Sequence, residues 1–94
     1  MNDANYFIDQ SKAILEARAV ERDVDKERSM VRIVNTFNAL TDLNLTVADG
    51  WSFMLILKLV RNNTKYQEDS IIDLISYAAL LGETLSCNEE NKEF

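Results

Sequence analysis

The sequence contains no proline and only two glycines, Gly50 and Gly82, in 94 residues. Proline and glycine are the residues that most strongly interrupt helices, so their scarcity favours long helical segments. The apolar residues, 47 % of the chain, recur largely at steps of three and four, which is the period of an amphipathic helix. The sequence therefore predicts an all-α fold.

Four helical segments are expected, joined by three connectors. They cover roughly residues 5–20, 25–41, 47–62 and 67–85. Thr46 is a suitable N-cap for the third segment, and Asp49 is the acidic partner that a capping box requires. Residues 86–94 are rich in glutamate and are expected to form an acidic C-terminal tail. We therefore predict one compact four-helix domain over residues 1–85, followed by this tail.

The third segment is apolar on almost every side. Its apolar residues are Trp51, Phe53, Met54, Leu55, Ile56, Leu57, Leu59 and Val60. Such a helix must be enclosed on most sides, either by its own domain or by another subunit. A domain of this size also buries only about 60–65 % of its unfolded surface, so a lone monomer would be marginally stable. We therefore expect the helices to assemble the chain into a homo-oligomer.

Composition narrows the possible functions. The chain has no histidine, which excludes imidazole as a base or metal ligand, and Cys87 alone cannot form an internal disulfide. Its formal net charge of −6 argues against duplex nucleic acid as a partner. No apolar run reaches the roughly 18 residues of a membrane span, and the N-terminus does not resemble a signal peptide. We therefore expect a cytoplasmic protein with no membrane partner.

Two stripes of residues on neighbouring predicted helices do not fit a plain helical bundle. They consist of Trp51, Lys58 and Arg61 on the third helix and Asp69, Asp73 and Tyr77 on the fourth. Facing each other, they would form a pocket of two cations, two carboxylates and two aromatic rings. Lys58 and Arg61 could hold a phosphate while one ring stacks on a base. The alternative is that the two cations only neutralise the two carboxylates across a helix pair.

The second predicted helix adds two candidate ligand-binding residues. Arg28, with Arg32 one turn later, could hold a phosphate at a subunit junction. The alternative is that both arginines are solvated neighbours of nearby acidic residues and contribute only tenths of a kcal/mol. Asn38 lies between Phe37 and Leu40, so its amide is expected to be half-buried and to need hydrogen-bond partners.

One segment of the chain is basic, although the net charge of the whole chain is negative. Between Gly50 and Gln67 there are three cations, Lys58, Arg61 and Lys65, and no acidic residue. This local charge of +3 favours a small phosphorylated ligand, although duplex DNA remains an unexpected partner.

Asp69 and Asp73 also suggest a metal-dependent alternative. The two carboxylates lie one turn apart and could share a Mg²⁺ with an acid from another helix, which would suffice for phosphoanhydride hydrolysis. Lys58 would repel a cation placed nearby. We therefore favour binding without catalysis and without a cofactor, and keep Mg²⁺-dependent hydrolysis as an alternative.

Several short motifs spread over about residues 20–83 resemble a family of small phage and prophage proteins. They are Glu27-Arg28-Ser29-Met30, Phe37-Asn38-Ala39-Leu40-Thr41, Asp49-Gly50-Trp51, Phe53-Met54, Leu57-Lys58, Arg61, Asp69, Asp73, Tyr77-Ala78-Ala79-Leu80 and Gly82-Glu83. That family is in turn distantly similar to the all-α nucleoside-triphosphate pyrophosphohydrolases of the MazG type. Those enzymes form dimers or tetramers and bind Mg²⁺ through Glu-x-x-Glu and Glu-x-x-Asp motifs. Here Asp69-x-x-x-Asp73 departs from the second motif by one residue, and the first motif is missing.

The sequence thus predicts a non-catalytic helical phage protein in the cytoplasm of the infected host cell. It would bind a nucleotide-like ligand and sequester a nucleotide signal of host immunity. Two alternatives stay open: an acidic protein that inhibits a host protein by binding it, and a MazG-like Mg²⁺-dependent pyrophosphohydrolase.

Overall fold

The computed structural model describes residues 2–25 and 29–90, which form four helices and contain no strand. The helices are α1 (Ala4–Asp25), α2 (Ser29–Thr41), α3 (Val47–Thr64) and α4 (Glu68–Glu90). The predicted all-α, four-helix fold is confirmed.

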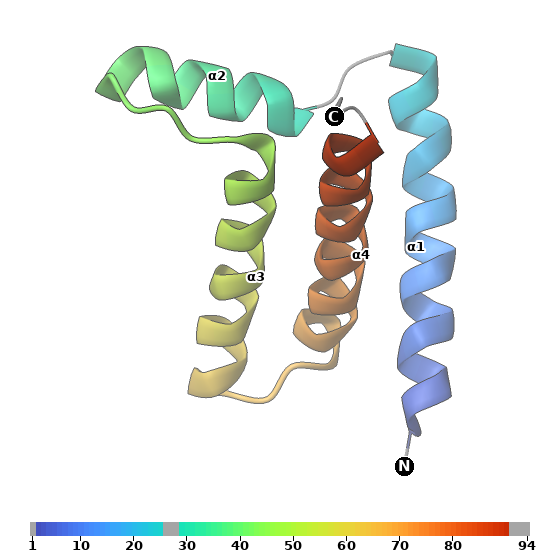
Figure 1. Cartoon of the computed structure of the whole chain (residues 1–94). Helices are drawn as coiled ribbons and strands as arrows, with labels where there is room; N and C mark the ends of the chain where they lie inside the picture. Colours follow the sequence, from blue (N-terminus) through green and yellow to red (C-terminus); the bar gives the residue numbers. More distant parts are fainter. Residues whose placement is uncertain (1, 26–28, 91–94) are drawn as a thin grey trace.

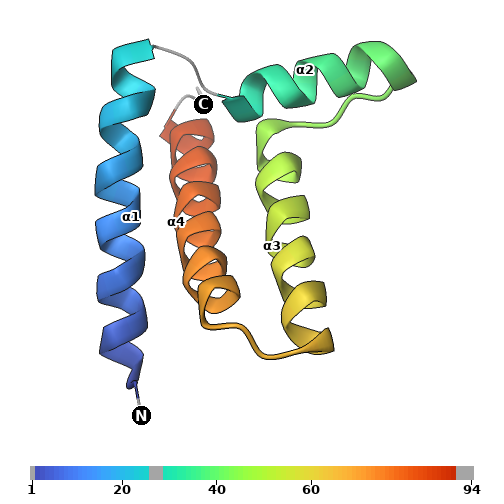
Figure 2. The same ribbon diagram turned by 180° about the vertical axis from the view of Figure 1, so that it is seen from behind.

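The helices form a row with one helix laid across its end. In Figures 1 and 2, α4 stands between α1 and α3, and α2 crosses the N-terminal end of α3. Among the described residues, α4 packs against both α1 and α3, whereas α2 packs against α3 alone. In both views α2 extends past α3 on the side away from α4, so the two helices form an L.

The predicted capping box opens α3. The Asp49 amide donates a hydrogen bond to the Thr46 hydroxyl at 3.1 Å, and the Thr46 amide donates to Asp49 Oδ2 at 2.9 Å. Both interactions satisfy amide groups that a helix start leaves without partners.

The turn between α2 and α3 is held by one side chain. Asn38 Nδ2 donates to the Leu45 carbonyl and Asn38 Oδ1 accepts from the Leu45 amide, both at 2.9 Å. Asp42, with a φ of 59°, adopts the left-handed conformation common just after a helix, and its amide donates to the Asn38 carbonyl at 2.9 Å. The expectation that Asn38 is half-buried and hydrogen-bonded is confirmed.

Two predicted helix ends were wrong, and so was one predicted start, because Asp25, where the second helix was expected to begin, is the last residue of α1. The helix expected to stop near residue 20 continues to Asp25, because the charged residues that follow contain no glycine or proline to end it. The last helix continues past Gly82 to Glu90, so residues 86–90 of the predicted tail are helical. A single glycine late in a helix lowers its stability without ending it when no proline follows. Residues 91–94 lie outside the described residues.

The core is small. Among the described apolar side chains, only Met30, Val34 and Ile72 are less than a tenth exposed. Between α1 and α4 the buried groups are small and polar: the Ser11 hydroxyl lies 2.9 Å from the carbonyl oxygens of both Phe7 and Ile72. This serine lets α1 approach α4 closely while its own polar group remains satisfied.

Gly50 marks the point where α2 crosses α3. A Cβ atom at this position would overlap the Met30 sulfur and lie 3.0 Å from Val34 Cγ2. The buried pair on α2 therefore packs directly on the backbone of α3, which explains why the third helix carries a glycine in its first turn.

Candidate functional site

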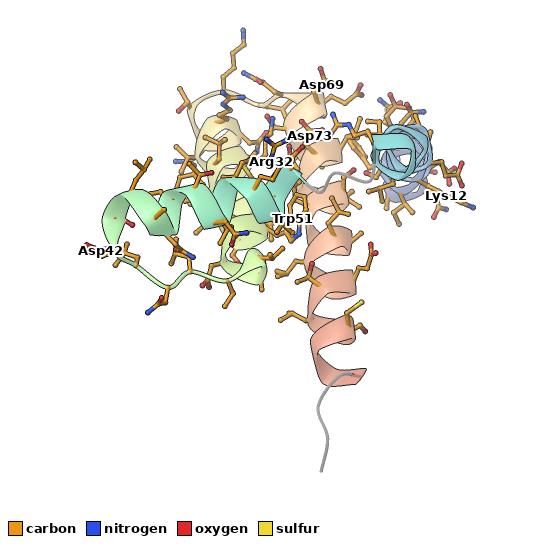
Figure 3. The ribbon with its side chains drawn as sticks, turned by 90° about the horizontal axis from the view of Figure 1, so that it is seen from above. Lys12, Arg32, Asp42, Trp51, Asp69 and Asp73 are labelled. Carbon is orange, nitrogen blue, oxygen red and sulfur yellow. The ribbon has the colours of Figure 1, made fainter. Side chains whose placement is uncertain are left out.

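Four of the predicted site residues meet between α3 and α4, and we call this group the α3–α4 seam. The Lys58 ammonium lies 2.9 Å from Asp73 Oδ2, with the two side chains only 13 % and 19 % exposed. The Trp51 and Tyr77 rings stack with centroids 5.9 Å apart and an interplanar angle of 26°. Figure 3 shows Trp51 and Asp73 where α3 and α4 face each other.

The seam favours a structural role for these four residues. The ammonium of Lys58 is neutralised by a carboxylate, and each ring already has a ring against one of its faces. The alternative that the cations neutralise carboxylates across a helix pair is confirmed for Lys58 and Asp73. Burying both charges costs desolvation energy, so the pair serves to fix how α3 sits on α4 more than to add net stability.

Arg61 and Asp69 do not complete the pattern. No ion pair joins them in the described part of the chain, and both side chains are exposed. Arg61 instead lines an open hollow of about 360 Å³ with Thr64, Lys65 and Gln67, which we call the basic hollow. It lies where α3 ends and α4 begins.

The backbone around the basic hollow is held by local hydrogen bonds. The Gln67 amide donates to Asn62 Oδ1 at 3.1 Å, and the Lys65 amide donates to the Arg61 carbonyl at 3.4 Å. Tyr66, between the two lining residues Lys65 and Gln67, is 63 % exposed. The hollow therefore combines two cations and two polar side chains with an exposed aromatic residue next to them in the chain.

Glu68, the first residue of α4, is hydrogen-bonded to residues near the N-terminus of the chain. Glu68 accepts hydrogen bonds from Asn2 Nδ2 at 2.6 Å and from the Tyr6 hydroxyl at 3.1 Å, which ties the start of α1 to the start of α4. The hydrogen bond to Glu68 raises the pKa of the Tyr6 hydroxyl above its usual value of 10.0, and desolvation and the nearby negative charges add to this shift. This contact joins residues 62 apart in the sequence, and no local pattern could have revealed it.

The other candidates lie apart from the seam. Asn38 holds the α2–α3 turn, at the opposite end of α3 from the basic hollow. Because α3 has 18 residues and is therefore about 27 Å long, the two places are far apart. Arg28 lies outside the described residues. Of the residues that line the basic hollow, Lys65 was singled out in the sequence only as part of the +3 segment, and Thr64 and Gln67 were not singled out. The one sequence signal for a turn at this place was the asparagine-rich end of α3.

The carboxylates of α4 form a poor cation site. Asp69 and Asp73 lie one turn apart, yet no group of three or more acidic or cysteine side chains that could hold a metal ion occurs among the side chains that the structure describes. Asp73 is paired with Lys58, and that ammonium would oppose a cation.

One segment of α4, Glu68–Cys87, is long and apolar enough by length and composition to cross a membrane, with 17 % of it buried in the fold. The cores of many globular proteins contain such helices, and this one packs between α1 and α3. Length and composition alone therefore do not assign α4 to a membrane.

Comparisons with known proteins leave the site without a characterised precedent. No curated protein and no solved structure matches the chain. One family model matches residues 7–85, which span all four helices and both the seam and the hollow. The chain belongs to the family described as Domain of unknown function (DUF6378).

Proposed function

We propose that this protein is a non-catalytic binder of a small nucleotide-like ligand and that the basic hollow holds the ligand's phosphate. The observation that supports this proposal is that the two cations in the hollow lack ion-pair partners within the part of the chain that the structure describes. Neither Arg61 nor Lys65 has an ion-pair partner among the described residues, whereas Lys58 has one. A guanidinium and an ammonium that share one hollow suit a phosphate group, because each can form charge-assisted hydrogen bonds with it.

The surroundings of the two cations support a nucleotide in particular. Thr64 and Gln67 supply neutral donors and acceptors for a sugar or a base. Tyr66 supplies an exposed ring, and aromatic stacking on a base contributes about 1–3 kcal/mol without selecting a sequence. In the sequence-based prediction Lys58 and Arg61 hold the phosphate; here we propose Lys65 and Arg61 instead.

Binding is favoured over hydrolysis by the state of the acidic residues. Asp73 is neutralised by Lys58, and Glu68 is hydrogen-bonded to residues at the start of α1. The carboxylates that a Mg²⁺-dependent hydrolase would need are thus either paired or dispersed. Sequestration of a nucleotide signal of host immunity is the biological role we propose, and its support is the resemblance to phage proteins.

Calorimetric titration of the full chain at low ionic strength tests the binding step. The probes are cyclic dinucleotides, cyclic trinucleotides and adenine–ribose signals. We expect one class to bind, with Arg61→Ala and Lys65→Ala each weakening binding about tenfold or more, as expected for the loss of one charge-assisted contact.

Lys12→Ala is the matched control, because Lys12 is an exposed cation on α1, on the far side of α4 from α3 (Figure 3). It removes the same charge and should leave affinity unchanged. No heat with any probe, or equal losses in all three variants, would contradict the proposal. Loss of binding in Lys58→Met with Arg61→Ala unaffected would return the site to the α3–α4 seam.

A further inference from the structure

The side of α3 that faces away from α4 is apolar and uncovered. Phe53, Ile56, Leu59 and Val60 are between 56 % and 67 % exposed. No residue of α3 is buried, although apolar residues dominate this helix. Within the described residues, this helix is therefore covered only where α4 packs along it and where α2 crosses its first turn.

Helix α2 also carries exposed apolar residues. Ile33, Phe37 and Leu40 are 59 %, 42 % and 81 % exposed and recur at steps of four and three along α2. Figures 1 and 2 show that α2 crosses the N-terminal end of α3 and projects beyond it, so these residues lie on the helix next to that end of α3. We call the two sets together the apolar outer face.

The exposed area of the molecule is large for its mass. The chain exposes 7239 Å², about 1,700 Å² more than a compact monomer of its mass, 10.8 kDa, would expose. A stable interface of ordinary size buries about 800 Å² on each partner. The excess is therefore large enough for a complete interface.

We infer that a second copy of this chain covers the apolar outer face, forming a two-fold symmetric dimer. The occupant must be present whenever the chain folds, because three well-buried apolar side chains among the described residues form a core too small for a stable monomer. A second copy is supplied wherever the protein is made, and its folding and association are then one equilibrium that depends on protein concentration.

The L shape is suited to two-fold pairing. The arm formed by α2 projects at the N-terminal end of α3 only, which leaves the C-terminal end of the outer face open. A two-fold axis near the middle of α3 places the arm of the second copy at that open end. Each copy then completes the other, as a self-complementary interface requires.

Charge is consistent with this pairing. The seven residues of the apolar outer face are uncharged, so the two copies can meet there although each carries a net charge of −6. Three cations, Arg32, Lys58 and Arg61, directly adjoin residues of this face in the sequence, and of these Lys58 lies in the seam and is neutralised by Asp73.

Sedimentation velocity of the full chain tests the inference. We expect a species of twice the 10.8 kDa chain mass, and we expect Ile56→Glu to raise the dissociation constant about 100-fold or more, because it would bury an unpaired charge. Ile8→Glu is the matched control: Ile8 is 53 % exposed on α1, Ile56 is 57 % exposed, and only the latter lies on the outer face.

Cross-linking tests the same surface without a disruptive charge. Ile56 lies at the middle of α3, so the two copies of this position should lie close to the two-fold axis. In a Cys87→Ser background, Ile56→Cys should form covalent dimers with a short bismaleimide, and Ile8→Cys should not. A monomeric wild type, equal dissociation by both glutamate variants, or a wild type that floats with vesicles of zwitterionic and anionic lipids instead of pairing would overturn the inference.

Discussion

On the side of α3 that packs against α4, polar and aromatic side chains find partners, whereas the opposite side is apolar and uncovered within the chain. Lys58 pairs with Asp73 and Trp51 stacks on Tyr77 in the seam, while residues such as Phe53 are two-thirds exposed. Polarity alone is therefore a poor guide to the interior of this protein. Its charged pair lies inside the fold, and its most apolar helix face lies outside.

The largest expected effect comes from breaking the seam. Asp73→Ala leaves the Lys58 ammonium largely buried without a partner, and we expect it to destabilise the fold by about 2–3 kcal/mol. The double variant Lys58→Met with Asp73→Leu should recover most of this loss, because it removes both charges together. Urea unfolding of the two variants measures the difference. An Asp73→Ala variant as stable as the wild type would show that the Lys58–Asp73 pair does not hold α3 on α4.

Gly50→Ala should be next in size. The added methyl group would overlap Met30 and press on Val34, so α2 must shift on α3, at a cost of about 1–2 kcal/mol. Gly82→Ala is the matched control, because a Cβ there has no atom within 4 Å; it should stabilise α4 by about 0.5–1 kcal/mol. Thermal unfolding should thus give shifts of opposite sign, and two shifts of the same sign would refute the close packing of α2 on α3.

A smaller gain is expected at the turn that sets the L. Asp42 has a φ of 59°, which disfavours any residue with a side chain, so Asp42→Gly should stabilise the fold by about 0.5 kcal/mol. The neighbouring exposed position offers a control, since Leu43→Gly has no such strain to relieve. Equal effects in chemical unfolding would mean that the left-handed turn does not hold α2 in place.

The smallest effect concerns the contact between Tyr6 and Glu68. The pKa of the Tyr6 hydroxyl is raised in the folded state, so its stabilising contribution is fully present below the unfolded value of 10.0 and is lost as the pH rises through the folded value. Wild type should therefore lose stability more steeply than Tyr6→Phe as the pH rises beyond 10.0. Parallel curves from thermal melts at increasing pH would show that this hydrogen bond does not couple α1 to α4.

Features that depend on residue spacing within one helix were predictable from the sequence. The Thr46–Asp49 capping box was predicted because its two residues are three apart in one helix, and the Lys58–Asp73 pair was predicted only as one of two interpretations of the stripes on two helices. The register between helices was not accessible in this way. Arg61 faces the basic hollow instead of Asp69, and Glu68 meets Tyr6, because contacts between helices depend on packing that no local pattern records.

The two faces of α3 were also beyond the sequence. An almost wholly apolar helix predicts enclosure without indicating what encloses each side. The structure assigns α4 to one side and leaves the other open, which turns a general expectation of assembly into a defined surface.

Does a second copy complete the outer side of α3? The most direct test is thermal unfolding of the wild type over about a 100-fold range of protein concentration. A dimer whose folding is coupled to association must show a Tm that rises with concentration, whereas the Tm of a monomer does not change. We expect a rising Tm for wild type and a parallel, lower curve for Asp73→Ala, since the seam lies within one chain. A Tm that stays constant across the whole range would contradict the proposed dimer.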